Sequence, residues 1–258
     1  MLNEITFFGE VDKVKIAIDR LKQFEPEEGY YLAFSGGKDS VTIKALADMA
    51  GVKYDAHYNL TTVDPPELVR FIKDKHPDVI IDKPEKTMWQ LIVENGTPPT
   101  RLMRYCCRVL KEGGGAGRRV LTGVRKAESN NRKNRRLVEV CMQDDTKTYL
   151  HPIIDWTDVE VWEFIKGYNV PYCELYDQGY KRLGCIMCPM GNTRGMEFEA
   201  KRYPKYYQAY MRAFARMLNE RNKKGLGYDG RWQTPEEVMH WWIYNPPKQD
   251  PDQTTMFE

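Results

Sequence analysis

The segment Ser35-Gly36-Gly37-Lys38-Asp39-Ser40 constrains the fold of this chain more than any other. It joins an apolar run at 30–34, typical of a buried strand, to a helical pattern at 41–49. Two glycines at such a turn let the backbone approach an anion, and the helix start directs N–H groups and its positive dipole end to the same point. The segment is not a Walker loop, because Leu32 stands where that motif needs a glycine. It predicts a phosphate or pyrophosphate site, and the alternative is a plain connecting turn.

Apolar strand-like runs alternate with helical patterns through the first two thirds of the chain. The expected strands lie at 53–59, 78–81, 119–123, 137–141 and 148–153, and the expected helices at 11–21, 67–75, 87–94, 100–112 and 157–166. This alternation predicts an α/β fold with a doubly wound, mostly parallel sheet, whose ligands bind beyond the carboxyl ends of the strands. We expect a nucleotide-binding α/β domain at 1–190, including the cysteine site, and a helical C-terminal extension at 191–258.

Composition and charge restrict the expected cellular location and the expected binding partners. No run of eighteen apolar residues and no signal-peptide pattern occurs, so we expect a cytoplasmic protein without a membrane partner. The net charge is only +2, yet residues 101–136 contain twelve Arg or Lys and two Glu. Such a run is either a solvated face or a site for a polyanion, and nucleic acid is then a candidate partner.

Four of the six cysteines form two close pairs, Cys106-Cys107 and Cys185-Ile-Met-Cys188. In a cytoplasmic protein such pairs favour metal ligation over disulfides. Four thiolates suit a [4Fe-4S] cluster or zinc, although adjacent cysteines are unusual for zinc. We expect Cys141, at the end of an apolar strand, to be a buried structural residue. Cys173 lies nearer the expected site, and its role is left open.

The glycine-rich segment resembles the SGGxDS signature of the PP-loop superfamily, which includes ATP pyrophosphatases, sulfurtransferases and the adenylyl-sulfate (APS) and phosphoadenylyl-sulfate (PAPS) reductases. The paired cysteines with a Cys-x-x-Cys also resemble the cluster-holding reductases. Four further stretches are similar to the PAPS reductase family, namely 62–67, 122–135, 151–162 and 171–180. Together they cover roughly residues 28–190, and their order is that of the family.

The resemblance implies an enzyme that binds an adenine nucleotide, either ATP, APS or PAPS. The residues implied for binding are Ser35, Gly36, Gly37, Lys38, Asp39, Ser40, Asp64, Gly123, Arg125, Glu128 and Arg132. The catalytic candidates are Lys38, Asp39, Arg125 and Cys173. The metal ligands implied are Cys106, Cys107, Cys185 and Cys188. Chemistry alone leaves the roles of three of these residues open. Asp39 and Asp64 suit either Mg²⁺ binding or a local cap, and Glu128 suits a ribose hydroxyl, an arginine or a surface ion pair.

For function, the resemblance implies reduction of APS or PAPS to sulfite with a [4Fe-4S] cluster and a thiol or electron-donor protein. The family's reductases use a nucleophilic cysteine in an E-C-G-x-H context, whereas no cysteine follows Cys188 in this sequence. Cys173, Cys141 or an external thiol would then take its place. The second hypothesis is an ATP-pyrophosphatase-type sulfurtransferase that adenylates and thiolates a nucleic acid or a small molecule. The third is a zinc-stabilised, non-catalytic module that binds a nucleotide or nucleic acid.

Overall fold

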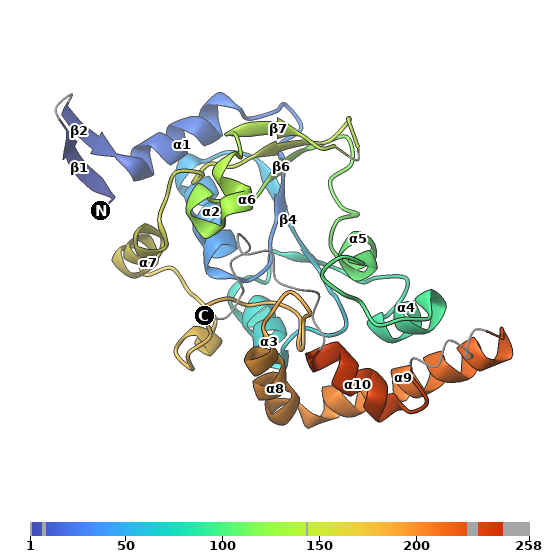
Figure 1. Cartoon of the computed structure of the whole chain (residues 1–258). Coiled ribbons are helices and arrows are strands. Elements are labelled where there is room, and N and C mark those ends of the chain that lie inside the picture. Colours follow the sequence, from blue (N-terminus) through green and yellow to red (C-terminus); the bar gives the residue numbers. More distant parts are fainter. Residues whose placement is uncertain (1, 7–8, 143, 226–231, 245–258) are drawn as a thin grey trace.

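The computed structural model describes residues 2–6, 9–142, 144–225 and 232–244. Its centre is a six-stranded sheet with the order β5-β4-β3-β6-β8-β7 (Figure 1). The strands are β3 Tyr30–Ala33, β4 Tyr54–Asn59, β5 Ile80–Asp82, β6 Arg119–Leu121, β7 Val138–Val140 and β8 Thr148–Leu150. Neighbouring strands are parallel except β7 with β8, which are antiparallel. The mostly parallel α/β sheet predicted from the sequence is confirmed.

The strand order reverses at β3, which pairs with β4 on one side and β6 on the other. A crevice forms outside the carboxyl ends of the strands at such a switch point, and ligands of α/β sheets bind there. Two segments singled out from the sequence leave the sheet here: Ser35–Ser40 after β3, and Gly123–Arg125 after β6. The topology therefore brings them together.

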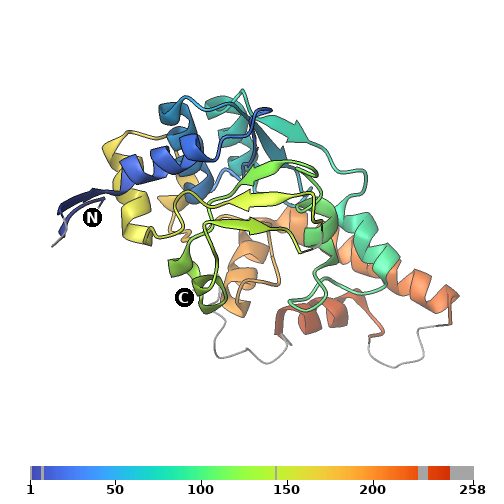
Figure 2. The same ribbon diagram turned by 90° about the horizontal axis from the view of Figure 1, so that it is seen from above.

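Helices α1 Lys13–Gln23, α2 Lys38–Ala50 and α7 Asp158–Gly167 form a layer in which α2 contacts both others. Figure 2 shows α1 and α2 over one face of the sheet. The remaining elements of this part are α3 Pro66–Lys75, α6 Asn130–Lys133 and the short 3₁₀ turns η1 Lys126–Glu128 and η2 Glu174–Tyr176. The main core lies between sheet and helices, where Leu32 and Trp156 are fully buried.

A second core joins the C-terminal helices to elements from the middle of the chain. Helices α8 Thr193–Arg202, α9 Pro204–Lys223 and α10 Pro235–Tyr244 pack with α4 Met88–Asn95 beyond one end of the sheet (Figure 1). The cluster also contains residues of α5 Tyr105–Leu110 and Ile186 of the Cys-x-x-Cys segment. The C-terminal helices thus share a hydrophobic core with the cysteine region. No helix in the described part of the chain is long and apolar enough to cross a membrane.

Two local predictions differ from the structure. The helix expected at 100–112 is limited to α5, because the preceding residues run as an irregular segment bound to other parts of the chain. The Arg101 guanidinium donates to the carbonyls of Pro189 (3.1 Å) and Gly191 (2.7 Å), and the Trp242 indole donates to Pro99 (2.7 Å). The sequence pattern also missed an N-terminal hairpin, β1 Asn3–Thr6 with β2 Gly9–Asp12.

Helix α7 begins with the predicted capping box. Thr157 Oγ1 accepts from the Glu160 N–H (3.3 Å), and the Glu160 carboxylate accepts from the Thr157 N–H (2.7 Å). Lys13 of α1 adds an ion pair at 2.6 Å to the buried Glu160. Burial alone would raise the pKa of Glu160, but its bonds with Lys13 and Thr157 lower the pKa to about 2. This interaction fixes the start of α7.

We expect Glu160→Gln to lower the free energy of unfolding by about 1–3 kcal/mol at pH 7, because Lys13 loses its buried partner. The pKa of Glu160 is lower in the folded than in the unfolded chain, so this stabilisation is present above pH 4.5 and lost as the pH falls toward 2. Denaturant unfolding of both proteins across this range should show the difference shrinking with acid. The control, Glu94→Gln, removes an exposed pair with Lys86 and should change stability by less than about 0.5 kcal/mol. A difference that persisted at pH 2 would contradict this account.

Candidate nucleotide and thiol sites

The glycine-rich loop forms a compact turn between β3 and α2. Gly36 has φ +69°, and a Cβ there would stand 2.7 Å from Leu68 and 2.9 Å from Ile72, so the position requires glycine. The Ser40 hydroxyl donates to the Gly37 carbonyl at 2.9 Å, and the Ser35 hydroxyl donates to that of Ser40 at 3.1 Å. These bonds hold the loop in the shape that directs the first turn of α2 at the crevice.

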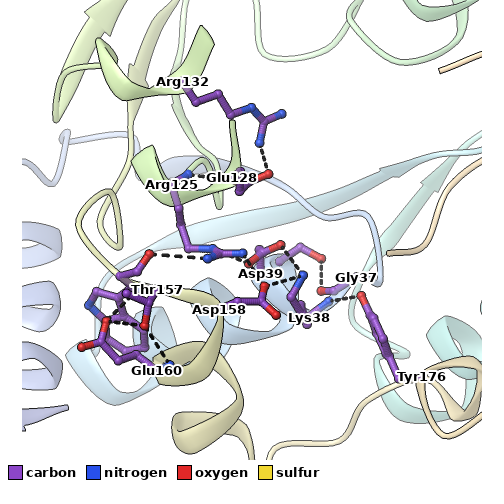
Figure 3. A network of polar contacts seen from close by, with 12 residues as sticks. Gly37, Lys38, Asp39, Arg125, Glu128, Arg132, Thr157, Asp158, Glu160 and Tyr176 are labelled. Carbon is purple, nitrogen blue, oxygen red and sulfur yellow. Dashed lines mark hydrogen bonds and ion pairs between the residues drawn. The ribbon is translucent and has the colours of Figure 1, made fainter. Parts of the chain in front are cut away.

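Lys38 is the first residue of α2 and is anchored at both ends. Its N–H donates to the Tyr176 hydroxyl from η2 at 2.8 Å. Its ammonium group lies 3.1 Å from a carboxylate oxygen of Asp158 and 3.6 Å from one of Asp39 (Figure 3). The Lys38 side chain is only 6% exposed, so its charge is directed into the cluster and not into bulk solvent. Neither Tyr176 nor Asp158 was singled out as a site residue from the sequence.

Arg125 is the centre of the same cluster. Its guanidinium donates to Asp39 from Nε (2.7 Å), to Asp158 from Nη2 (3.0 Å) and to the Trp156 carbonyl from Nη1 (3.4 Å). Burial would lower the pKa of Arg125, but the carboxylate of Asp39 raises it, so the guanidinium stays charged. The side chain is 2% exposed. Arg125 thus connects the segment after β6 with the first turns of α2 and α7 (Figure 3).

Gly123 explains how this segment comes so close to α2. A Cβ at Gly123 would stand 2.7 Å from the Cβ of Asp39 and 2.9 Å from its backbone carbon. Only a residue without a side chain fits at this approach. Asp39 pairs with Arg125, while the N-cap position of α2 is Gly37 and has no side-chain cap bond. Of the two roles considered for Asp39, helix capping is therefore not seen.

Glu128 and Arg132 form the outer part of the network. The Glu128 carboxylate accepts from the Arg125 N–H at 2.9 Å and pairs with the Arg132 guanidinium. Figure 3 shows Arg132 directed at Glu128, on the far side of Arg125 from Lys38. Among the roles considered for Glu128, the structure shows the arginine pair.

Asp64 organises the turn after β4, the strand next to β3. Its carboxylate accepts from the Thr61 N–H at 2.6 Å, and its side chain is buried. The Cys-x-x-Cys segment rests on this turn: Ile186 N–H donates to the Val63 carbonyl (2.8 Å), and the Cys185 thiol lies 3.4 Å from the Thr61 hydroxyl. The cysteine region is therefore attached at the same edge of the sheet as the loop after β3.

The four paired cysteines meet in space, although they lie far apart in the sequence. Cys106, Cys107, Cys185 and Cys188 line a single cavity of about 30 Å³, together with Thr61, Lys111 and Tyr210 among others. Within the described ranges, no group of three or more His, Cys, Asp or Glu side chains is already arranged around a metal position. The structure thus gathers the four thiols around one cavity without showing a closed ligand set.

Neighbouring groups shift the pKa values of these thiols in opposite directions. A hydrogen bond from Cys106, aided by Arg104, lowers the pKa of Cys107 to about 5, whereas this bond and burial raise the pKa of Cys106. Burial raises the pKa of Cys188 to about 12. The neighbouring sulfurs of Cys185 and Cys188 raise the pKa of Lys111, which also lines the cavity. The four thiols are therefore accompanied by the basic side chains of Lys111 and Arg104.

The loop that carries Cys185 and Cys188 is held from behind. Met187 adopts φ +56°, an unusual conformation for a residue with a side chain, and its N–H donates to the buried Glu199 carboxylate at 2.5 Å. Burial raises the pKa of Glu199 to about 7. The Tyr210 hydroxyl donates to the Ile186 carbonyl at 3.1 Å. Both supports come from the C-terminal helices, and no sequence motif pointed to them.

The other two cysteines lie elsewhere. Cys173 is fully buried in the main core, and burial raises the pKa of its thiol, so it is a poor nucleophile in this structure. Cys141 was expected to be buried, but it is half-buried, because β7 is an edge strand on which Val140 is 60% exposed. Its sulfur lies 3.5 Å from the Tyr149 hydroxyl.

The chain is similar to several known proteins. It is 28% identical over 225 residues to an uncharacterised protein of Methanocaldococcus jannaschii, covering 78% of this chain and 45% of that protein. It is 31% identical over 159 residues to an adenosine 5'-phosphosulfate reductase of Oceanobacillus iheyensis (55% and 60%) and 29% identical to a probable FAD synthase of Caenorhabditis elegans (70% and 34%). The chain spans about a third to three fifths of the length of these relatives.

A solved structure shares the fold. The phosphoadenylyl-sulfate reductase of Candida auris, a phosphate complex, superposes with a TM-score of 0.52 at 20% identity, over 67% of this chain and 89% of that one. The model of the phosphoadenosine phosphosulfate reductase domain matches residues 29–191, which include the loop, Arg125 and all four paired cysteines. The chain therefore belongs to the phosphoadenosine phosphosulfate reductase domain family.

Proposed function

We propose that this protein binds an adenine nucleotide through Ser35–Ser40 and carries out sulfur chemistry on it, reducing APS or PAPS to sulfite. The observation that supports this most is the placement of two chemical units along one edge of the sheet. Lys38 and Arg125 supply buried cations at the end of β3, and four thiols surround a cavity attached to the turn after β4. The proposed phosphate site and the proposed thiol site thus share one edge of the sheet.

The phosphate part of this proposal follows from the loop. The first turn of α2 supplies backbone N–H groups and the positive end of the helix dipole. Lys38 and Arg125 supply charge, which is worth more here than at the surface because both side chains are buried. When the nucleotide phosphate becomes a leaving group, these cations stabilise its developing charge.

The thiol part fits an iron–sulfur centre by the chemistry of its donors. Cys106, Cys107, Cys185 and Cys188 would hold a [4Fe-4S] cluster, which four thiolates suit, and zinc is the alternative. Lys111 and Arg104 would offset the negative charge that such a centre carries. When bound, the cluster would supply one-electron chemistry or a site for sulfur. The contacts of the Cys-x-x-Cys segment with Val63, Glu199 and Tyr210 would orient two of the thiols.

Reduction requires a thiol that the described residues do not place at the loop. A thiolate attacks the sulfur of APS or PAPS, the sulfur–oxygen bond to the phosphate breaks, and AMP or its 3'-phosphate leaves. A second thiol then attacks the thiosulfonate, which releases sulfite and leaves a disulfide. Because Cys173 is buried in the core, we assign both electrons to an external thiol or a thiol protein.

The same observation on Cys173 favours a second candidate, an ATP-dependent sulfurtransferase. Here ATP adenylates an acceptor oxygen with release of pyrophosphate, and sulfur then displaces AMP. No separate nucleophilic thiol beside the loop is needed. Exposed basic residues such as Lys126, Lys133 and Arg136 could contact a nucleic-acid acceptor, and Asp39 is a candidate for Mg²⁺. The zinc-stabilised, non-catalytic nucleotide- or nucleic-acid-binding module has less support, because the family relatives with a named activity are enzymes.

We expect the purified protein to release sulfite from APS or PAPS with a dithiol donor. A sulfurtransferase would instead release pyrophosphate from ATP in the presence of an acceptor. In either case Lys38→Ala should weaken nucleotide affinity about 10- to 100-fold, because the phosphate loses a buried cation. Lys22→Ala, which removes an exposed lysine of α1, is the control. Calorimetry and product analysis check both points, and a protein that releases neither product would refute the enzymatic proposal.

Gly123→Ala tests the close approach of the β6 segment to the loop. The new methyl group would overlap Asp39, so we expect a loss of about 1–3 kcal/mol in the free energy of unfolding and at least a tenfold weaker binding of ATP, APS or PAPS. Gly113→Ala is the matched control, because a Cβ at Gly113 meets nothing within 4 Å. Equal effects of the two substitutions would argue against a role for this approach in binding.

Metal analysis tests the thiol site directly. After purification without oxygen we expect about four iron and four sulfide per chain, as a [4Fe-4S] cluster requires. Cys107→Ser and Cys185→Ser should each lose most of the iron, while Cys141→Ser, outside the cavity, should retain it. Zinc in place of iron would support the alternative metal. Full iron content in Cys185→Ser would show that the ligand set is wrong.

A further inference from the structure

The two buried cations of the loop cluster are covered on their solvent side by one carboxylate. The side chains of Lys38 and Arg125 are 6% and 2% exposed, whereas that of Asp158 is 61% exposed. One oxygen of Asp158 lies 3.1 Å from the Lys38 ammonium and 3.0 Å from Nη2 of Arg125. Figure 3 shows Asp158 reaching this point from the start of α7. An anion that enters from solvent therefore meets the negative charge of Asp158 at the point where the anion would contact the two cations.

The charges of the cluster balance before any ligand arrives. Asp39 lies on α2 next to Lys38 and pairs with Nε of Arg125 at 2.7 Å. Asp158 pairs with both cations from a different element. Two carboxylates thus neutralise two cations. A phosphate group bound at this point would face uncompensated negative charge unless a carboxylate moved or a cation came with the ligand.

Asp158 is the carboxylate that is free to move. It occupies the first turn of α7 and is largely exposed, so rotation of its side chain places the carboxylate in water, and an arriving phosphate replaces its pairing with the two cations. Asp39 is held under Gly123 and is 25% exposed. The capping of α7 depends on Thr157 and Glu160, so the helix start does not need the Asp158 side chain for its cap.

We propose that Asp158 is an internal competitor for the anionic group of the nucleotide: its carboxylate occupies the position of a phosphate oxygen between Lys38 and Arg125 and is displaced when the nucleotide binds. This inference rests on the phosphate-binding role of the loop in the proposed function. Asp158 holds the two cations in place in the free protein, and anions with weak affinity for these cations do not displace it. Asp158 is thus a specificity-determining residue of the loop.

The test compares Asp158→Asn with wild type by calorimetry, using inorganic pyrophosphate, ATP and adenosine as ligands. Removing the competitor should tighten the binding of pyrophosphate and ATP about tenfold, and adenosine, which has no phosphate, should be unaffected. Asp155→Asn is the matched control. It makes the same charge change three residues earlier, where the carboxylate pairs with Arg20 at 2.7 Å. The control should change the affinity less than about twofold, and the difference between the variants should persist at higher salt.

Thermal unfolding supplies a second readout. Without ligand, Asp158→Asn should unfold at a lower temperature than wild type, because two buried cations lose a partner. With pyrophosphate, it should be stabilised more than wild type. A residue with only a structural role would lower stability without raising affinity. Tighter binding by Asp158→Asn that is matched by Asp155→Asn, or no tightening at all, would overturn the inference.

The outcomes for this inference and for the proposed function are distinct. If Asp158→Asn binds pyrophosphate more tightly while no protein releases sulfite or pyrophosphate product, the competitor role stands and the proposed activity fails. If wild type turns over a nucleotide and Asp158→Asn shows no gain in affinity, the activity stands and the competitor role fails. If neither protein binds pyrophosphate or ATP and neither releases sulfite or pyrophosphate, both fail.

Discussion

The burial of the Arg125 guanidinium is the interaction on which the geometry of the Lys38–Arg125 cluster, the proposed nucleotide site, depends. A guanidinium removed from water is stable only when its donors are satisfied by charged or carbonyl partners. Here those partners are Asp39 on α2, Asp158 on α7 and the Trp156 carbonyl. One side chain from the segment after β6 therefore fixes the relative positions of three segments that are distant in sequence. The position of Lys38 follows, because its ammonium shares Asp158 with Arg125.

The sheet topology and a short turn connect this cluster to the thiols. The order reversal at β3 places the loop and the Arg125 segment at one crevice, while β4 carries the turn that ends in Asp64. Leu60 of that turn packs on the main core, and Val63 belongs to the second core with the C-terminal helices. The turn is thus where the two cores meet. The distance between the cavity and the loop is set by packing on both sides of a few residues, so a rigid relation between the two sites does not require a separate domain interface.

The sequence predicted the parts of this arrangement that local patterns encode. Strand-to-helix periodicity located β3, α2 and the loop between them, and the capping box located the start of α7. The meeting of Cys106 and Cys107 with Cys185 and Cys188 was inferred from resemblance, and the cavity they line agrees with it. Long-range partners were out of reach: the sequence analysis gave no site role to Asp158, Tyr176 or Glu199. Their roles arise from tertiary contacts that no periodicity records. The helix expected at 100–112 failed for the same reason, because Arg101 is drawn into bonds with the Cys188–Gly191 turn.

Both proposed reactions, reduction and sulfur transfer, would require the loop to bind a nucleotide phosphate. They differ in the nucleophile. In reduction the bond that breaks joins sulfur to a phosphate oxygen, and in transfer it joins the adenylated acceptor to AMP. In both, negative charge grows on a nucleotide phosphate as it leaves, and buried cations are the groups that stabilise it. Lys38 and Arg125 are equally suited to either reaction, which is why their geometry alone does not choose between them. Which of the two reactions takes place would depend on the nucleophile, that is, on the sulfur or thiol compound that reaches the thiol cavity. The buried position of Cys173 matters for this reason: in the proposed reduction, the nucleophilic thiol would have to come from another molecule and not from the main core.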